Sequence, residues 1–428
     1  MNISTKDRLR LREVARLCAE LAASERNQRL WNLWMQNGSS KAPIQPTIRI
    51  ETHNYIDRLL QPFMQCEGPE ARAMEKRLMG PWANFTLFED DTIMPAYYGI
   101  TDHLSFVPFG LPVRRQETGG VGHHFIPYLR DLESDEHLLG ASVYSVDEAA
   151  AEAEMQLAGD LFGDLLPPRR ISNCSGCCLT QDIVHIMNMD DMYIAMVDDE
   201  ERFHAMMRRL TDDYIAFFQM LEDGKHLHGG ARMQHLNQGS YCFTNELPDG
   251  EPGTPNSQRW LFMDSQETAA ISPSMYRDLV FPYYKDLMSR FGLVSYGCCE
   301  ASHPIWEECL STVPNLRKVS ISPWCDEELM GERLRGTGIT YVRKPPATLV
   351  GMDTPYLDEE ASLACFRKTA KAASGCKLEI AQRDVYLAGL PRQGASFCGA
   401  GAAGAGGMET HCINIKPHPV RHAGWGLM

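Results

Sequence analysis

The stretch that decides the fold runs from residue 291 to 326 and reads FGLVSYGCCEASHPIWEECLSTVPNLRKVSISPWCD. A short apolar run before Gly297 predicts a strand, and a second apolar run after Pro314 predicts another. Between them, apolar residues recur at the spacing of one helical face: Ile305, Trp306, Cys309 and Leu310. Because strand, helix and strand form the repeating unit of a parallel sheet, this stretch predicts an α/β fold.

Working outward from this unit, we count eight strands along the chain, most of them separated by helical segments. They centre on Ile48, Tyr97, Ile171, an interrupted strand through Leu227 and Leu261, Val294, Val319, Tyr341 and Ile380. Eight parallel strands with intervening helices indicate a (β/α)8 barrel, the TIM barrel. A doubly wound open sheet is the alternative.

The predicted barrel occupies residues 41–388 and lies between two segments of different character. Residues 1–40 carry apolar stripes at helical spacing and predict an N-terminal helical extension. Residues 389–428 are rich in glycine and alanine and predict a flexible tail. The tail matches G-x-G-x-x-G from Gly399 to Gly404, but a dinucleotide-binding loop needs a strand before it and a helix after it.

Composition limits the classes of function. The chain has 428 residues, 44% hydrophobic and 23% charged, which is typical of a globular protein with a large core. A net charge of -15 argues against a nucleic-acid partner. The N-terminus is charged throughout, unlike a signal peptide, and no run approaches the ~18 apolar residues of a membrane span. We therefore expect a cytoplasmic protein without a membrane partner.

The chain contains 14 cysteines, and without a secretion signal a disulfide framework is not expected. Two clusters stand out: Cys174-Ser-Gly-Cys177-Cys178, and the pair Cys298-Cys299 directly after a predicted strand. In parallel sheets, reactive groups gather where the strands end. Thiols this close together in a reducing compartment point to metal binding or redox chemistry.

Several segments give the chain a family resemblance. Met263-Asp-Ser-Gln-Glu-Thr-Ala-Ala-Ile-Ser-Pro-Ser-Met-Tyr276, with Phe281-Pro-Tyr283, resembles the segment after the fourth strand of uroporphyrinogen decarboxylases. Tyr296-Gly-Cys298-Cys-Glu300 stands where corrinoid-linked methyltransferases of the same superfamily carry a His-x-Cys zinc motif, and Val342-Arg-Lys-Pro345 where the family has a Gly-Asn-x-Asp-Pro turn. The resemblance covers residues 150–385 and implies a barrel with its site at the C-terminal mouth.

The sequence also departs from this family. The first predicted strand reads Ile48-Arg-Ile-Glu51-Thr-His53, so the decarboxylases' Met-Arg-Gln-Ala-Gly-Arg segment, whose arginines bind substrate carboxylates, is absent. Tyr296 takes the place of the zinc-binding histidine. At the place of the third zinc ligand, a cysteine on the last strand, stand Gln382, Arg383 and Asp384. The first departure argues against tetrapyrrole decarboxylation.

For a metal, the resemblance and the clustered thiols together suggest zinc bound by Cys298, Cys299 and His228. Thiolates are good zinc ligands, and an open position on the metal would activate a substrate thiol. Glu246 and Glu300 are further candidate ligands. The alternative is that both thiols only pack the mouth, because adjacent residues on a strand point to opposite faces and bind one ion only if the strand has ended.

The other candidate site residues are carboxylates, cations and polar groups near predicted strand ends. The candidates for catalysis are Glu246, Glu267, Tyr296 and Glu300. The candidates for substrate binding are Cys174, Asn245, Asp264, Gln266, Trp324, Arg343 and Lys344. The alternative for the carboxylates is a hydrogen bond that anchors a loop, and for the two cations it is pairing with surface acids.

The resemblance implies methyl transfer between a corrinoid, carried by a partner protein, and a zinc-activated thiolate or another small-molecule acceptor. A first alternative is a lyase that decarboxylates a tetrapyrrole or another acid, with Asp264 or Glu246 at the substrate. A second is a barrel that binds a ligand or metal without turnover. Homodimer formation is left open, and the residues do not specify the substrate or the methyl donor.

Overall fold

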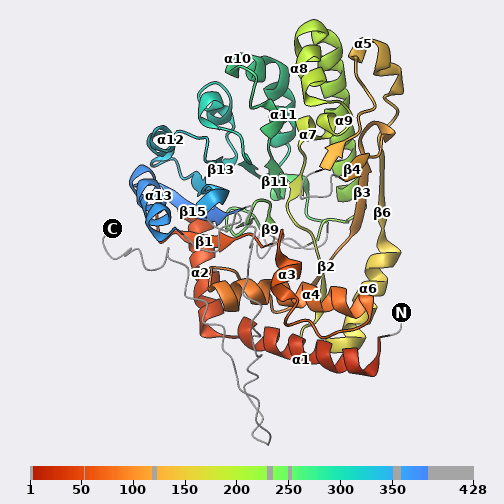
Figure 1. Cartoon of the computed structure of the whole chain (residues 1–428), viewed down its shortest axis with the longest axis vertical. Helices are drawn as coiled ribbons and strands as arrows, with labels where there is room; N and C mark the ends of the chain where they lie inside the picture. Colours follow the sequence, from red (N-terminus) through yellow and green to blue (C-terminus); the bar gives the residue numbers. More distant parts are fainter. Residues whose placement is uncertain are drawn as a thin grey trace, which may run out of the picture.

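The computed structural model describes residues 3–52, 54–117, 123–228, 235–248, 253–349 and 358–383. At its centre lies a sheet of seven strands, curved like part of a barrel (Figure 1). The strands are β1 (Thr47–Ile50), β8 (Ser175–Gly176), β11 (Trp260–Met263), β12 (Leu293–Tyr296), β13 (Leu316–Ile321), β14 (Thr340–Arg343) and β15 (Lys377–Gln382). Their order in the sheet is β1-β15-β14-β13-β12-β11-β8, and every neighbouring pair is parallel. The expected α/β fold with a parallel sheet is therefore confirmed.

Helices follow one another around the outer face of this sheet (Figure 1). They are α7 (Leu179–Val184), α8 (Met189–Asp198), α9 (Glu200–Asp223), α10 (Pro273–Met275), α11 (Phe281–Ser289), α12 (Glu327–Leu334) and α13 (Glu359–Ala372). Successive strand residues alternate between the two faces. Val294 and Tyr296 therefore pack in the main core beneath the helices, while Leu293 packs in a small cluster on the inner face. Both faces are covered, and every residue of β11 and β12 is buried.

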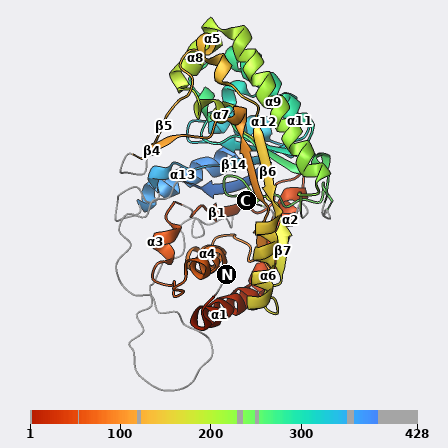
Figure 2. The same ribbon diagram turned by 90° about the vertical axis from the view of Figure 1, so that its right-hand side faces the viewer.

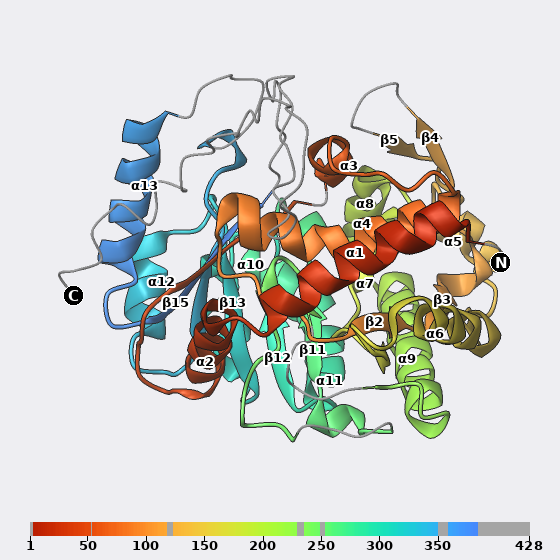
Figure 3. The ribbon, with the colours of Figure 1, turned by 90° about the horizontal axis from the view of Figure 1, so that it is seen from below.

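The N-terminal segment is helical, as expected, but it forms two helices. They are α1 (Thr5–Ala22) and α2 (Glu25–Ser39). The break falls at Ser24, whose hydroxyl accepts a hydrogen bond from the Asn27 amide and caps α2. A second core joins these helices to three others (Figures 2 and 3): α3 (Ile56–Leu60), α4 (Pro69–Ala83) and α6 (Glu148–Phe162).

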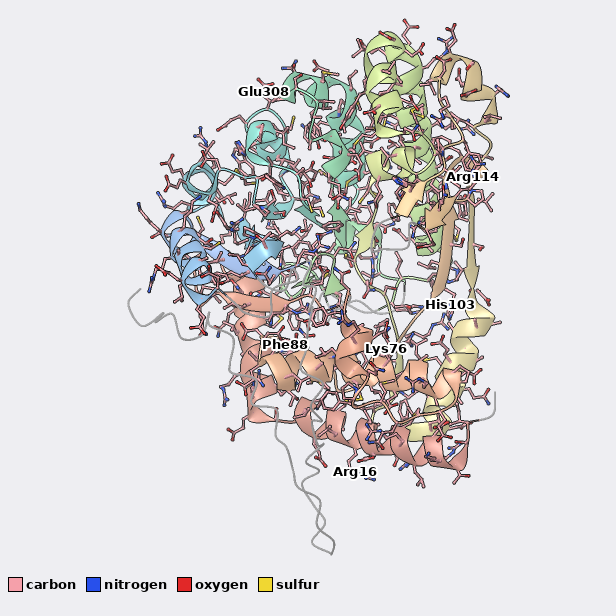
Figure 4. All side chains as sticks on the ribbon, viewed as in Figure 1. Arg16, Lys76, Phe88, His103, Arg114 and Glu308 are labelled. Carbon is pink, nitrogen blue, oxygen red and sulfur yellow. The ribbon has the colours of Figure 1, made fainter. Side chains whose placement is uncertain are left out.

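The region from about 104 to 145 contains an antiparallel pair of strands beside the main body. Its strands are β3 (His103–Val107) and β6 (Val143–Asp147), with a smaller hairpin of β4 (Arg115–Glu117) and β5 (His123–Phe125), and the short helix α5 (Leu132–Asp135). In Figure 4, His103 marks the start of β3, and Glu308 marks the helical side of the sheet.

In the described residues the barrel is not closed, so the prediction of an eight-stranded barrel is wrong in that respect. The second expected strand, β2 (Tyr98–Thr101), pairs with β7 (Pro168–Ile171) in a separate sheet and not with β1. The edge of β1 that does not face β15 instead bonds to two buried aspartates. Asp91 Oδ2 accepts from the Ile48 amide at 2.8 Å, and Asp90 Oδ2 accepts from the Ile50 amide at 2.9 Å. Because these carboxylates occupy the edge amides, no neighbouring strand is needed there.

The concave side of the sheet is filled by a short hairpin, here called the lumen hairpin, of β9 (His235–Leu236) and β10 (Ser240–Tyr241). The ammonium group of Lys318 holds it, donating to Ser240 Oγ at 2.8 Å and to the Tyr241 carbonyl at 2.9 Å. Glu379, also on the inner face, pairs with Lys318 at 2.6 Å. Leu227, expected to be in a strand, lies outside any strand.

Among the described residues, no helix combines the length and apolarity required to cross a bilayer. The tail expected over 389–428 lies outside the described residues.

Candidate functional site

Because the seven strands are parallel, their carboxyl ends meet along one edge of the sheet, here called the mouth. Chemically reactive side chains follow five of these strands. They are Cys178 after β8, Asp264 after β11, Cys298, Cys299 and Glu300 after β12, Lys344 after β14, and Arg383 after β15. We call this set the thiol site. Five of its seven members were predicted to be catalytic, substrate-binding or metal-binding residues.

Glu300 shapes the loop that presents the thiols. Its carboxylate is buried and accepts two backbone hydrogen bonds, from the Ser265 amide at 3.0 Å and from the Cys298 amide at 2.8 Å. Gly297 precedes the thiols with φ of 104°, a conformation that favours glycine. A Cβ at Gly297 would also approach the Cβ of Ser320 to 2.9 Å. Glu300 therefore ties the ends of β11 and β12 together.

Cys298 and Cys299 point toward each other, because β12 ends before them. Their sulfur atoms are 3.5 Å apart, and Arg383 Nη1 donates to Cys298 Sγ at 3.2 Å. Cys298 is buried, whereas Cys299 is exposed. The hydrogen bond with Cys299 and burial raise the pKa of the Cys298 thiol, and the charges of Lys344 and Arg383 act against that rise. The reactivity of Cys298 thus depends on two opposing sets of neighbours.

Asp264 is the acidic group of the site. It is 4% exposed, and its Oδ1 accepts no hydrogen bond from any part of the chain that the structure describes. Burial raises the pKa of Asp264 to about 8, with further contributions from the charges of Glu300 and Cys298, while a hydrogen bond with Cys178 opposes the rise. At neutral pH this carboxyl group is therefore mostly protonated and can donate a proton.

The cations near the mouth are already engaged by the protein. The Lys344 ammonium group donates to Gln238 Oε1 and the Gly297 carbonyl at 3.0 Å each, and to the Cys298 carbonyl at 3.3 Å. These three acceptors use all three of its donors. Arg383 pairs with Glu51 at 2.6 Å. Burial lowers the pKa of Lys344.

Arg343 was predicted to bind substrate, but it points away from the mouth, into the helical layer. Its guanidinium group pairs with Glu327 at 3.0 Å, donates to Thr369 at 3.2 Å, and contacts three backbone carbonyls. Tyr296, predicted to be catalytic, lies in the same layer, where its hydroxyl contacts those of Ser265 and Tyr276. The alternation of β14 and β12 directs both side chains outward.

Two other candidates lie at the opposite end of the sheet. Glu246 pairs with Arg317, near the start of β13, at 3.0 Å. The Asn245 amide donates to Ser39 Oγ, at the end of α2, at 2.9 Å. These contacts do not bring either residue to the thiol site.

Cys174 and His228 are also not gathered with Cys298. Cys174 precedes β8 and packs on the small inner cluster, and a hydrogen bond from the thiol of Cys242 lowers its pKa. His228 bonds to Asp102, its Nε2 lying 3.2 Å from Oδ2, and burial lowers the pKa of His228. Arg170 shares the same carboxylate. The cysteine cluster is thus divided, with only its later members near the mouth.

The remaining candidates lie near strand ends. Glu267 is buried, accepts from Thr180 Oγ1 at 2.9 Å and contacts Gln266, and burial raises its pKa. Trp324 follows β13 and is 75% exposed. Their proposed roles in catalysis and substrate binding stay predictions.

The described residues do not complete a zinc site. The two thiols are close enough to share an ion, but the Glu300 carboxylate is bound to amides and His228 lies with Asp102. No group of three or more His, Cys, Asp or Glu side chains within the described ranges is arranged to hold a metal ion. Arg383 also places a positive charge beside Cys298, where a cation would bind. Zinc therefore stays a prediction, and no chemical step below depends on it.

Gln238, at the tip of the lumen hairpin, was not predicted as a site residue. Its side-chain oxygen accepts from Lys344 at 3.0 Å and also from Arg383. The one local signal is Asn237-Gln-Gly239, a turn composition in a polar insertion, which does not reveal contacts more than 100 residues away.

Two hollows lie away from the thiols. A cavity of about 350 Å³ opens beside β1 where the sheet is not closed, and its lining includes Arg49, His235 and Tyr241. Burial lowers the pKa of His235 to about 3, so its imidazole is neutral there. A larger hollow of about 1220 Å³ lies between α2 and α13, near the start of β15. Since the larger hollow is at the end opposite the mouth, its size gives it no claim as the active site.

Comparisons with known proteins do not establish a family. No family model matches the chain, and no curated protein matches it. Among solved structures, the chain is similar to a methyltransferase from Methanosarcina mazei, with 12% identity and a TM-score of 0.45. The alignment covers 83% of this chain and 93% of that one. The assignment of function therefore depends on the residues of the site.

Proposed function

We propose that this chain is an enzyme that transfers a methyl group at the thiol site, with Asp264 as the general acid. The observation that supports this most is the state of Asp264, a buried carboxyl whose pKa is raised to about 8 and whose Oδ1 has no partner among the described residues. A protonated carboxyl group next to reactive thiols is suited to protonating a leaving group.

In the proposed reaction, a nucleophile attacks the methyl carbon of a methyl–heteroatom compound. The new bond to carbon forms as the carbon–heteroatom bond breaks, and the electron pair of the broken bond stays on the heteroatom. Asp264 gives that heteroatom its proton and becomes a carboxylate, which solvent then reprotonates. Cys298, whose charge acts on Asp264, and its neighbour Cys299 bind or orient the reactants.

The resemblance of residues 263–283 and 296–300 to corrinoid-linked methyltransferases supports the choice of a methyl group. A corrinoid on a partner protein would supply the nucleophile or the methyl donor. The cationic side chains near the mouth already bond to other groups of the protein, which supports methyl transfer over decarboxylation. Arg343 pairs with Glu327, Arg383 with Glu51, and Lys344 uses its donors on neutral oxygens. A carboxylate substrate at the mouth would need at least one of these groups.

The test uses the full chain with cob(I)alamin and a panel of small methoxy, methylamino and methylthio compounds. Formation of methylcobalamin, followed by its absorbance, is the expected result. Asp264→Asn should slow it about 10²-fold, the usual contribution of a general acid. Asp182→Asn is the matched control, because Asp182 is another buried carboxyl, with a pKa raised to about 7, that bonds to Tyr214. Release of CO2 from carboxylic acids without methylcobalamin formation would instead identify a lyase.

A further inference from the structure

The lumen hairpin, residues 235–241, connects the inside of the sheet to the thiol site. The hairpin is bonded to the inner face of the sheet. Ser240 Oγ donates to Glu379 at 2.5 Å, and Lys318 donates to both Ser240 and Tyr241. Glu379 and Lys318 are almost fully buried. The tip of the hairpin is therefore held at a defined position near the mouth.

The backbone at this tip is in a conformation that favours glycine. Gln238 has φ of 68° and Gly239 has φ of 83°. A residue with a Cβ is destabilised in this left-handed region, so glycine would be the more stable choice at both positions. At Gly239 a Cβ would lie 3.3 Å from the Cβ of Ala381. A glutamine at position 238 in such a conformation suggests a use for its side chain.

The side chain of Gln238 contacts both cations of the thiol site. Its Oε1 accepts from Lys344 Nζ at 3.0 Å and from Arg383 Nη1. The same Nη1 of Arg383 donates to Cys298 Sγ at 3.2 Å, and the same Nζ of Lys344 donates to the Cys298 carbonyl at 3.3 Å. One amide oxygen thus fixes both positive groups that contact Cys298.

We propose that Gln238 is a positioning residue that aims Arg383 and Lys344 at Cys298 and thereby sets the reactivity of this thiol. A neutral amide suits this role, because a carboxylate in its place would cancel the positive field at the sulfur. The inference rests on the assignment of Cys298 to the proposed site, but it does not require that the transferred group is methyl.

The test measures how fast iodoacetamide modifies Cys298 in the full chain as a function of pH. Fragment-ion mass spectrometry separates Cys298 from its neighbour. Two variants are compared with wild type: Gln238→Gly removes the side chain and relieves the backbone, and Gln238→Met keeps the length but removes the acceptor. In both, we expect the profile to move to higher pH by about one unit, which is about a tenfold slower reaction below the midpoint.

Lys225→Gly is the matched control. Lys225 is exposed and also has a positive φ, of 58°, so this change relieves a similar backbone conformation outside the thiol site. Its profile should match that of wild type. Gln238→Gly should still unfold in a single cooperative transition, which a loss of folding would not produce.

The inference is overturned if neither Gln238 variant moves the profile. It is also overturned if only Gln238→Gly does, since the hairpin backbone and not the amide would then be responsible. Both outcomes are independent of the cobalamin assay. A chain that shows the expected thiol profile but no methyl transfer would contradict the proposed function and leave the role of Gln238 intact.

Discussion

Arg383 Nη1 donates a hydrogen bond to the sulfur of Cys298 at 3.2 Å, while Arg383 Nε pairs with Glu51 at 2.6 Å. These contacts join the last strand, the first strand and the loop after β12 at a single point. The guanidinium group is therefore held in place and supplies a positive charge to the thiol. Replacement of Arg383 by Met removes this charge, and the alkylation profile of Cys298 should move to higher pH. An unchanged profile would show that the contact has no electrostatic effect on the sulfur.

Cys299 has the opposite effect on the same thiol. Its hydrogen bond with Cys298 is the largest cause of the raised pKa of Cys298. Cys299→Ala should therefore lower the pKa of Cys298 and speed its alkylation at neutral pH. Cys309→Ala is a suitable control, because Cys309 is a buried thiol in the main core. Slower alkylation of Cys298 in Cys299→Ala would contradict this assignment.

Metal removal tests whether Arg383 and Lys344, or a bound zinc ion, control the state of Cys298. If Arg383 and Lys344 set the state of Cys298, treatment with a chelator leaves the alkylation profile of Cys298 unchanged. A profile that shifts on chelation, and returns when zinc is added, would show that zinc binds at these thiols. Measurement of zinc per chain in wild type and in the Cys298→Ser/Cys299→Ser double variant gives an independent check.

The buried pair of Lys318 and Glu379 should dominate the stability of the lumen hairpin. Both side chains are at most 3% exposed and their charged atoms are 2.6 Å apart. Lys318→Met leaves the Glu379 carboxylate buried without its partner and should lower the free energy of unfolding by about 3–5 kcal/mol. The double variant Lys318→Met/Glu379→Gln should recover part of this loss. Equal denaturation curves for wild type and Lys318→Met would contradict the structure of the hairpin.

Arg343 offers a test of which cations belong to the site. Because it is buried with Glu327 beneath the helices, Arg343→Met should destabilise the fold but leave the pH profile of Cys298 alkylation unchanged. A shift in that profile without a loss of stability would place Arg343 at the thiols instead.

Much of the fold could be predicted because its signals are local. Short apolar runs, separated by segments with helical spacing, predicted parallel strands around Val294, Val319, Tyr341 and Ile380. All four strands lie in the sheet. Barrel closure could not be predicted in this way. It fails because Asp90 and Asp91 bond to the edge of β1, and such side-chain contacts leave no periodic pattern in the sequence.

The site was predicted in part for a related reason. Asp264, Cys298 and Lys344 follow predicted strands, so they were expected at one edge of the sheet. The structure brings them together there. Strand alternation, applied from Val294 to Tyr296 and from Tyr341 to Arg343, would have directed the latter residue of each pair outward. Gln238 was beyond reach, because its contacts with Lys344 and Arg383 depend on a hairpin that enters the concave side of the sheet.

A protonated Asp264 at neutral pH should also affect the stability of the fold. Its pKa rises from 3.8 in the unfolded chain to about 8 in the folded one. The folded state therefore holds a proton that the unfolded state has lost, and this stabilising contribution is complete below about pH 4 and lost as pH rises to about 8. Relative to wild type, Asp264→Asn should gain stability over this range, by at most about 1.4 kcal/mol per pH unit. Parallel stability curves from pH 5 to 8 would indicate an ionised Asp264.

The most direct test is infrared difference spectroscopy of the full chain, titrated between pH 5 and 9, in wild type and in Asp264→Asn. We expect a carboxylic-acid carbonyl band that disappears with a midpoint near pH 8 in wild type and is absent from the variant. If Asp264 is already a carboxylate at pH 6, it cannot act as the general acid and the proposed mechanism is wrong.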